Sequence, residues 1–222
     1  MTGSSLNEIE ELIENLNKIF PLKDLEELNF FLGLEVKYLD DGYILLSQEK
    51  YAAKLLEKAG MSISNAMPTP MISSVKLHKH DSEPCENPGL YRSIVGVLQY
   101  LTTTRLDLSY AVNKASQFMH NLTAEQWKVV KRILRYIKGT RGQGLIFSKS
   151  SDYMILAFAD ADWGADLDDC RSVTGYYIYL GENLIAWKPQ KQSKVSKSST
   201  EAEYRVIASA QAAAVVAVQQ LL

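Results

Sequence analysis

The sequence has little cysteine or histidine, and neither residue type is spaced as a set of metal ligands. The two cysteines, Cys85 and Cys170, lie far apart, and the three histidines form no ligand-type cluster. The absence of paired cysteines excludes a disulfide framework and a thiolate zinc site. Two isolated thiols are typical of a protein in a reducing compartment.

The sequence also lacks an excess of charge of one sign. Its formal net charge is −2 at pH 7, which excludes the strongly basic class of nucleic-acid binders, so any nucleic-acid surface must be local. The N-terminal stretch MTGSSLNEIEELIENL is polar and acidic, unlike a secretory or transit signal. We therefore expect an intracellular protein.

No long uninterrupted apolar run is present. The most apolar stretch, residues 206–222, is interrupted by Ser209 and by Gln211, Gln219 and Gln220. It is slightly short for a membrane span of about 20 residues. The pattern favours a buried helix and no membrane partner; a tail anchor is the alternative.

The first 60 residues predict a helix followed by a hairpin and a second helix. A capping box opens at Ser5, and apolar residues then recur at helical spacing to about Phe20. NFFLGLEVKYL alternates as a single strand, and the Asp-Gly pair after it marks a hairpin turn. Ser47 is expected to cap the next helix, which Gly60 would end.

Proline is scarce, and four of the six prolines fall within residues 61–88, which predicts an extended linker. Helical spacing resumes over residues 91–101 and again over residues 111–118, and a capping box at Thr123 opens a helix that ends at Gly139. From Gly144 the pattern changes to short strands, GLIF, YMILAFA, TGYYIYL and NLIAW, before a last helix near Ser199. Strands followed by a helix are typical of an α+β unit.

Acidic residues gather where a predicted strand ends and where the last helix begins. Asp160 and Asp162 end the strand in AFADADWGADLDD, and Glu201 and Glu203 fall at the helix start. Carboxylates from separate elements can share Mg²⁺, and two such ions clamp a phosphodiester during cleavage. Acidic residues also complement the dipole of a helix start with no chemistry at all. The spacing alone leaves both interpretations open.

Several long stretches resemble one family and follow its order. They are FPLKDLEELNFFLGLEV, YAAKLLEKAGM, YRSIVGVLQYLTTTRLDLSYAVNKASQFM, VVKRILRYIKGT, ADADWGADLDDCRSVTGYYIYLG and KQSKVSKSSTEAEYR. Because these stretches run almost from end to end, the sequence is identified as similar to the C-terminal part of the Pol polyprotein of copia-type LTR retrotransposons, especially those of plants.

The resemblance implies three segments. Residues 1–60 resemble a C-terminal remnant of the reverse transcriptase palm, and residues 61–143 a thumb/connection-like helical region with its linker. Residues 144–222 resemble a truncated RNase H domain. The expected fold class is α+β or α/β, in which the reverse transcriptase remnant precedes an incomplete RNase H-like mixed sheet with one helix.

The resemblance also implies a substrate and site residues. RNase H cuts the RNA strand of RNA–DNA hybrids, so the implied partners are hybrid or duplex nucleic acid and the remainder of Pol, in a cytoplasmic particle or the nucleus. Asp160 matches the family's first catalytic aspartate, and Glu203, directly before Tyr204, matches its glutamate. Both are expected to be catalytic residues and Mg²⁺ ligands, whereas Glu201 is expected to serve the helix terminus.

The family pattern is incomplete in this sequence. The family's polymerase aspartates precede the Thr-Gly-Ser-Ser stretch with which the chain begins, and two of its four RNase H carboxylates follow the helix with which the chain ends. We therefore expect a Pol fragment that is inactive alone. An active Mg²⁺-dependent RNase H, completed by a second chain, and a non-catalytic nucleic-acid-binding module are the alternatives.

Basic residues cluster in two places. In the loop before the last helix, the candidate phosphate contacts are Lys188, Lys191, Lys194, Lys197, Ser198 and Ser199. Lysines, serines and helix starts position a nucleic-acid backbone, although a solvated basic loop has the same composition. The basic helix face from Lys128 to Arg141 either tracks a duplex or is solvated.

Overall fold

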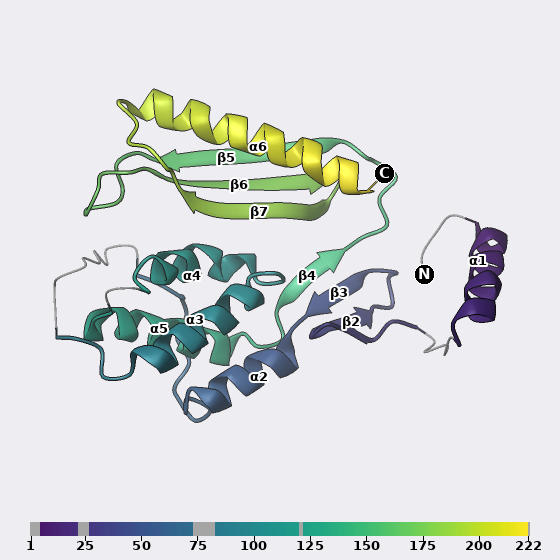
Figure 1. The fold of residues 1–222 in the computed structure, drawn as a ribbon, viewed down its shortest axis with the longest axis horizontal. Helices are drawn as coiled ribbons and strands as arrows, with labels where there is room; N and C mark the ends of the chain where they lie inside the picture. Colours follow the sequence, from purple (N-terminus) through teal and green to yellow (C-terminus); the bar gives the residue numbers. More distant parts are fainter. Residues whose placement is uncertain (1–4, 22–26, 73–82, 120–121, 222) are drawn as a thin grey trace.

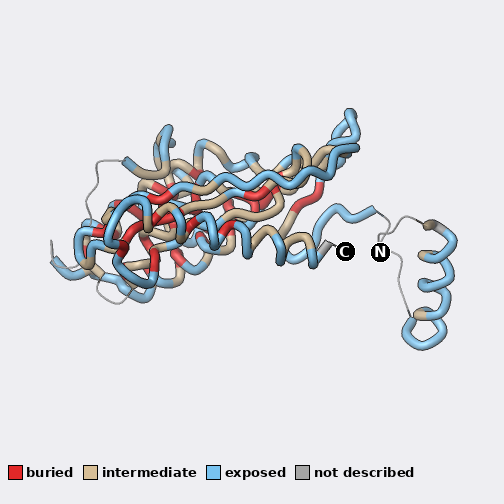
Figure 2. Tube along the Cα trace, turned by 90° about the horizontal axis from the view of Figure 1, so that it is seen from above, coloured by how far each residue is buried: buried red, intermediate tan, exposed pale blue. Residues whose placement is uncertain are grey.

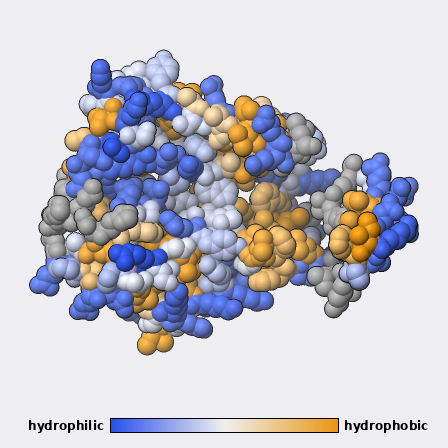
Figure 3. All heavy atoms as spheres, in the orientation of Figure 1, coloured by the Kyte–Doolittle hydropathy of each residue, from blue (hydrophilic) through white to orange (hydrophobic). Residues whose placement is uncertain are grey.

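The computed structural model describes residues 5–21, 27–72, 83–119 and 122–221. Figure 1 shows helix α1 (Leu6–Ile19) apart from the rest, a group of helices beside a small sheet, and a second sheet under a long helix. α1 begins as predicted, because Ser5 Oγ accepts a hydrogen bond from the N–H of Glu8. Figure 3 shows hydrophobic spheres on one side of α1 and hydrophilic spheres on the other.

The first sheet is antiparallel and contains four short strands. In spatial order these are β1 (Phe30–Phe31), β2 (Leu34–Tyr38), β3 (Ile44–Ser47) and β4 (Gly144–Phe147). The predicted hairpin turn is confirmed, with Gly42 at φ 77° between β2 and β3. β4 pairs with β3, so residues 144–147 complete this sheet, although the sequence grouped them with the later strands.

The prediction of one continuous strand over NFFLGLEVKYL was wrong. The chain reverses at Leu32 and Gly33, whose φ angles are 48° and 83°, and β1 folds back on β2. The hydroxyl of Tyr100 donates a hydrogen bond to the carbonyl of Leu32 and holds this turn against the helices. Apolar residues occur on both sides of the turn, so the sequence pattern alone does not reveal that the chain reverses here.

The main core lies among five helical segments; Figure 2 shows buried segments within the main body of the molecule and mostly exposed chain along α1. The helical segments are α2 (Glu49–Lys58), α3 (Pro88–Leu101), the 3-10 turn η1 (Leu106–Leu108), α4 (Ser109–Ser116) and α5 (Ala124–Gly139). The capping box of α5 at Thr123 is confirmed, as is Gly60, at φ 66°, which follows Ala59, the C-cap of α2. The predicted cap of α2 was wrong, because Gln48 occupies that position and Ser47 ends β3 with a buried side chain.

Residues 61–72 form no helix or strand, in agreement with the predicted extended linker, whereas residues 73–82 lie outside the described part of the chain. The segment 61–72 follows the surface of α5. Met67 N–H bonds to the carbonyl of Arg135, and the Arg135 side chain bonds to the carbonyl of Asn65. This linker is therefore attached to the helical core.

The second sheet is antiparallel and carries α6 (Ser199–Leu221) across one face (Figure 1). Its strands are β5 (Ile155–Asp162), β6 (Val173–Leu180) and β7 (Asn183–Lys191), in that order. The fold is thus α+β as expected, but the expected mixed sheet was wrong, since both sheets are antiparallel across the described residues. In the described part of the chain, no helix has the length and hydropathy to cross a membrane.

Candidate functional site

α6 begins at a capped terminus that uses one of the two candidate glutamates. Ser198 Oγ accepts a hydrogen bond from the N–H of Glu201 at 3.1 Å. The Glu201 carboxylate accepts from the Lys197 N–H at 2.8 Å and pairs with Arg205 at 2.6 Å. The bond from Lys197, and then that from Arg205, lower the pKa of Glu201. Glu201 therefore serves the helix terminus, as expected.

Glu203 reaches the neighbouring strand. α6 packs on β5 through Ala202 and Val206, which contact Ala161. This packing places the half-buried Glu203 beside the strand, where its Oε1 accepts a hydrogen bond from the Ala161 N–H at 3.3 Å. The glutamate side chain thus touches the backbone of the residue directly after Asp160.

Asp160 belongs to the other face of β5. Side chains alternate along a strand, and Ala159 and Ala161 lie against α6, so Asp160 and Asp162 project toward the helical core. In agreement with this, burial and then the charge of Asp162 raise the pKa of Tyr110 on α4. The structure brings Glu203 to the backbone beside Asp160 but leaves the two carboxylates on different faces.

This arrangement does not supply the ligands of a two-metal site. Such a site requires several carboxylates that converge on a pair of ions. Among the residues that the structure describes, no group of three or more His, Cys, Asp or Glu side chains is placed to hold a metal ion. The donor set therefore does not fit a pair of Mg²⁺ ions, and the catalytic assignment of Asp160 and Glu203 stays a prediction.

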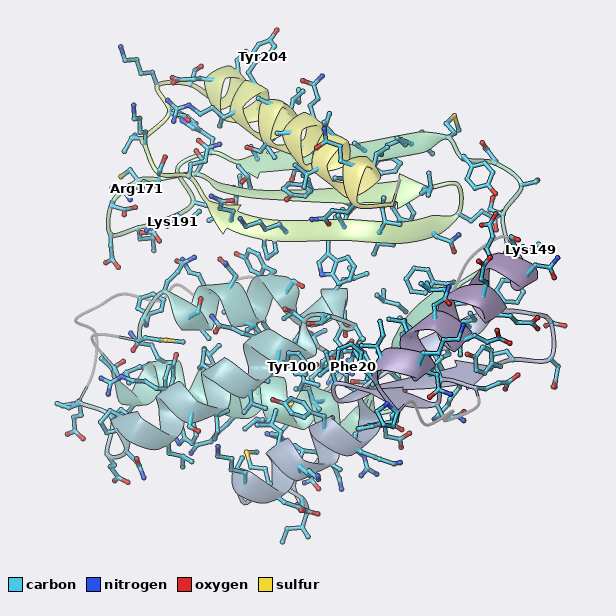
Figure 4. The ribbon with its side chains drawn as sticks, turned by 45° about the vertical axis from the view of Figure 1, so that its right-hand side comes forward. Phe20, Tyr100, Lys149, Arg171, Lys191 and Tyr204 are labelled. Atoms are coloured by element: carbon cyan, nitrogen blue, oxygen red, sulfur yellow. The ribbon has the colours of Figure 1, made fainter. Side chains whose placement is uncertain are left out.

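The predicted phosphate-binding residues share one end of the second sheet, but they are not equally available. Lys188, Lys194, Lys197, Ser198 and Ser199 are exposed. Lys191 is instead held by two carboxylates, with its Nζ 2.8 Å from both Asp166 Oδ2 and Asp169 Oδ2. Figure 4 shows Lys191 close to Arg171, at the end of the sheet where α6 begins. Lys194 and Lys197 are the lysines of this loop best placed for a phosphate.

Asp166 was seen in the sequence only as part of an acidic run, and its role was missed. The residue is 3% exposed. Its Oδ2 pairs with Lys191 of β7 and, at 3.5 Å, with Lys114 of α4, and its Oδ1 accepts the N–H of Asp168 at 3.0 Å. Burial alone would raise the pKa of Asp166, but the bond from Lys191 and the charge of Lys114 outweigh it and lower the pKa to about 2. No local sequence pattern signals such a buried network.

Hydrogen bonds to a buried serine hold the loop between β7 and α6 in place. Ser196 is buried, and its Oγ donates to Gln192 Oε1 at 2.7 Å. The indole N–H of Trp163, directly after β5, donates to the carbonyl of Ser196 at 2.9 Å. The exposed lysines of the loop are therefore carried on a backbone that these hydrogen bonds hold in place.

Comparisons with known proteins identify sequences that are similar to this chain. A family model described as reverse transcriptase (RNA-dependent DNA polymerase) matches residues 1–73. The chain is 44% identical over 208 residues to the retrovirus-related Pol polyprotein from transposon RE1 of Arabidopsis thaliana, covering 94% of this chain and 14% of that protein. The corresponding polyprotein from transposon TNT 1-94 of Nicotiana tabacum is 36% identical over 212 residues, which are 92% of this chain and 16% of the relative.

A shorter relative is covered almost completely. An uncharacterized mitochondrial protein of Arabidopsis thaliana is 43% identical over 212 residues, which are 94% of this chain and 86% of the relative. The chain thus spans about one seventh of the RE1 polyprotein but most of this relative. No solved structure matches the chain.

Proposed function

Because this chain belongs to the Pol polyprotein family of copia-type retrotransposons, we propose that its second sheet and α6 are an RNase H-like unit that binds RNA–DNA hybrid or duplex nucleic acid. The remaining helices and the first sheet would then correspond to the end of the reverse transcriptase. The physiological partner would be the remainder of Pol together with the hybrid made during reverse transcription.

The contact between Glu203 and β5 carries this proposal. The resemblance requires that a glutamate in the helix after the sheet approach the strand that holds Asp160, and Glu203 Oε1 lies 3.3 Å from the N–H of Ala161. The start of α6 beside this contact is capped by Ser198 and Glu201, but Lys194 and Lys197 are exposed in the adjoining loop. The positive charge of these lysines suits a phosphate backbone.

We further propose that the chain alone binds without cutting. Asp160 and Glu203 lie on different faces of β5, so cleavage by two metal ions would need additional carboxylates and a rotated Asp160 side chain. Mg²⁺ ligation by these two residues would require a site that is completed by other parts of Pol. The competing proposal is an active Mg²⁺-dependent RNase H, and the observation in its favour is the contact of Glu203 with the backbone of Ala161, directly after Asp160.

Binding is tested with a fluorescently labelled RNA–DNA hybrid. We expect anisotropy to report an affinity that falls as salt concentration rises, because bound phosphates release counterions. Replacing Lys194 and Lys197 with alanine should weaken binding and reduce the salt slope by about 2. The same double replacement at the exposed Lys54 and Lys149 is the matched control and should leave affinity unchanged. Equal losses in both variants would contradict a localized interface.

Cleavage is tested on the same hybrid with Mg²⁺ or Mn²⁺. We expect no product from the chain alone, at protein concentrations that saturate binding. Product that disappears in Asp160→Asn and Glu203→Gln, but not in Glu201→Gln, would overturn the proposal of binding without cutting and establish the active RNase H instead.

A further inference from the structure

A cavity of about 730 Å³ lies between the second sheet and the helical core. One wall comes from η1 and α4 and the other from the sheet face opposite α6. Two hydrogen bonds join the second sheet to the helical core beside this cavity: Trp187 Nε1 donates to the Thr102 carbonyl at 3.2 Å, and Asn113 Nδ2 donates to the Pro189 carbonyl at 3.2 Å. Cavities of ~300–1,000 Å³ at the interface of two units are typical of small-molecule sites.

The sheet wall of this cavity is aromatic. Phe158 on β5, Tyr177 on β6 and Trp187 on β7 are consecutive cross-strand partners, so their side chains share one face. Tyr110 of α4 completes the lining from the other side and is 50% exposed. Phe158 is 57% exposed. Exposed aromatic faces that line a hollow offer a surface for an apolar or cationic group.

The charge of the lining is negative. Asp160 and Asp162 line the cavity, and neither side-chain carboxylate forms a hydrogen bond or ion pair with another described residue. Asp107, in the opposite wall, is already paired with Arg105 at 2.7 Å. Lys188 adjoins the cavity, but it follows Trp187 on β7 and its side chain therefore belongs to the other face of the sheet. Two carboxylates thus remain without a cation.

A buried hydroxyl at the same place also lacks a partner. Ser109, at the start of α4, lines the cavity and is 7% exposed, and its Oγ has no hydrogen-bond partner among the described residues. Buried polar groups in folded proteins are normally satisfied. The Ser109 Oγ itself has almost no accessible surface, so the aromatic side chains and the two carboxylates form the surface that a ligand would contact.

We propose that this cavity binds a small organic cation, with an alkylammonium or quaternary ammonium group against the aromatic rings and between Asp160 and Asp162. The aromatic faces attract the cation and exclude water, and the carboxylates balance its charge. A nucleotide does not suit this lining, because its phosphate would meet two carboxylates without a facing lysine. The site shares Asp160 with the predicted Mg²⁺ ligands, whereas Lys194 and Lys197, the lysines proposed to bind nucleic acid, do not line the cavity.

The first test uses choline and its uncharged carbon analogue, 3,3-dimethylbutan-1-ol, with the full chain and no nucleic acid. The two molecules have the same shape, so the difference in their affinities, measured by isothermal titration calorimetry, isolates the charge. We expect choline to bind at least tenfold more tightly than the alcohol. Equal affinities would overturn the proposal.

Variants locate the site. The double substitution Asp160→Asn with Asp162→Asn should weaken choline binding at least tenfold, and Tyr110→Leu should weaken it several-fold while circular dichroism stays unchanged. Asp40→Asn with Asp41→Asn removes the same charge from an exposed turn and should have no effect. A similar loss of affinity in that control would show a diffuse acidic surface and would overturn the proposal. Displacement of choline by an equal concentration of Mg²⁺ would show a metal-selective surface and would overturn it as well. Because hybrid binding is measured separately, failure of either proposal is recognized without the other.

Discussion

Asp166 is a single carboxylate that joins three separate segments of the chain. It lies in the loop between β5 and β6, and it pairs with Lys191 of β7 and Lys114 of α4. Lys191 also pairs with Asp169, and these carboxylates raise the pKa of Lys191 against the lowering effect of its burial. Removing the charge of Asp166 would leave Lys114 without this ion pair in a half-buried position, which is costly.

The low pKa of Asp166 predicts a defined pH dependence. Its folded pKa, about 2, lies below the ordinary value of 3.8, so its contribution to stability is fully present above about pH 4 and is lost as pH falls toward 2. At pH 7, Asp166→Asn should lower the free energy of unfolding by about 2 kcal/mol. Urea denaturation at pH 7, 5 and 3 should show the difference between variant and wild type shrinking at pH 3.

Asp41→Asn provides the reference for this measurement, since Asp41 is exposed in the β2–β3 turn. Its effect should stay within about 0.5 kcal/mol at each pH. A difference between Asp166→Asn and wild type that does not change from pH 7 to pH 3 would contradict the assigned pKa.

At the scale of residues, the sequence identified the acidic residues of the site but not the directions in which their side chains point. It placed Asp160 on a strand and Glu203 at a helix start, and both positions are correct. The face on which Asp160 lies depends on which strand residues pack against α6, and the alternating alanines of β5 look alike in sequence. The burial of Asp166 depends on Lys114, which is 52 residues away, so no local pattern could indicate it.

At the scale of elements, the turn between β1 and β2 is the place where backbone conformation and residue type disagree most clearly. Leu32 adopts φ 48° and is 72% exposed. Only glycine, and sometimes asparagine or aspartate, adopts this left-handed region without a cost of about 1–2 kcal/mol. The turn persists because the hydroxyl of Tyr100 donates a hydrogen bond to the carbonyl of Leu32.

Leu32→Asn should therefore stabilize the protein. The substitution removes the clash of a bulky side chain in a left-handed conformation and sacrifices little packing, so we expect the midpoint of urea unfolding to rise by the equivalent of about 0.5–1 kcal/mol. Gly33→Ala, at φ 83°, should have the opposite effect. A loss of stability in Leu32→Asn would mean that the Leu32 side chain makes contacts that outweigh the backbone strain.

The segment 61–72 gives the basic face of α5 a structural role. Arg132 Nη2 donates to Thr69 Oγ1 at 2.7 Å, Arg135 Nε donates to the Asn65 carbonyl at 2.7 Å, and Lys138 donates to the Ser62 carbonyl. These cationic side chains supply hydrogen-bond donors to oxygen atoms of a stretch of chain that forms no helix or strand. The two interpretations of this face, duplex tracking or a solvated surface, both omitted this third use of the charges.

Arg135→Ala should release the segment 61–72 without unfolding α5. The substitution removes the bond to the Asn65 carbonyl, so amide hydrogen exchange over residues 61–72 should quicken at least fivefold while the amides inside α5 keep their protection. Lys131→Ala, also on the exposed surface of α5, is the matched control and should leave the segment unchanged. Unaltered exchange in Arg135→Ala would show that apolar contacts of Met61 and Met71 with the core hold the segment by themselves.

At the scale of the whole molecule, the order of the elements was largely predictable, whereas their grouping was not. Periodicity located α2, α3, α4 and α5, because each buries an apolar stripe in the main core. The pairing of β4 with β3 joins residues that are about 100 positions apart, and periodicity carries no information on such partners. The second sheet therefore begins at β5. The connection from β4 to β5 links two units, the first sheet with the helical core and the second sheet with α6. These units also meet through the hydrogen bond from Trp187 to the Thr102 carbonyl.

Trp187 should couple the stability of these two units. Its indole N–H donates to the Thr102 carbonyl directly after α3, so Trp187→Leu removes a bond that spans them. We expect amide exchange to quicken at least tenfold at residues 102–108 as well as along β7, as measured by mass spectrometry under native conditions. Trp163→Leu is the matched change, because Trp163 bonds to Ser196 within the second unit, and it should leave residues 102–108 unaffected. Exchange at residues 102–108 that stays at the wild-type rate in Trp187→Leu would mean that the two units open independently.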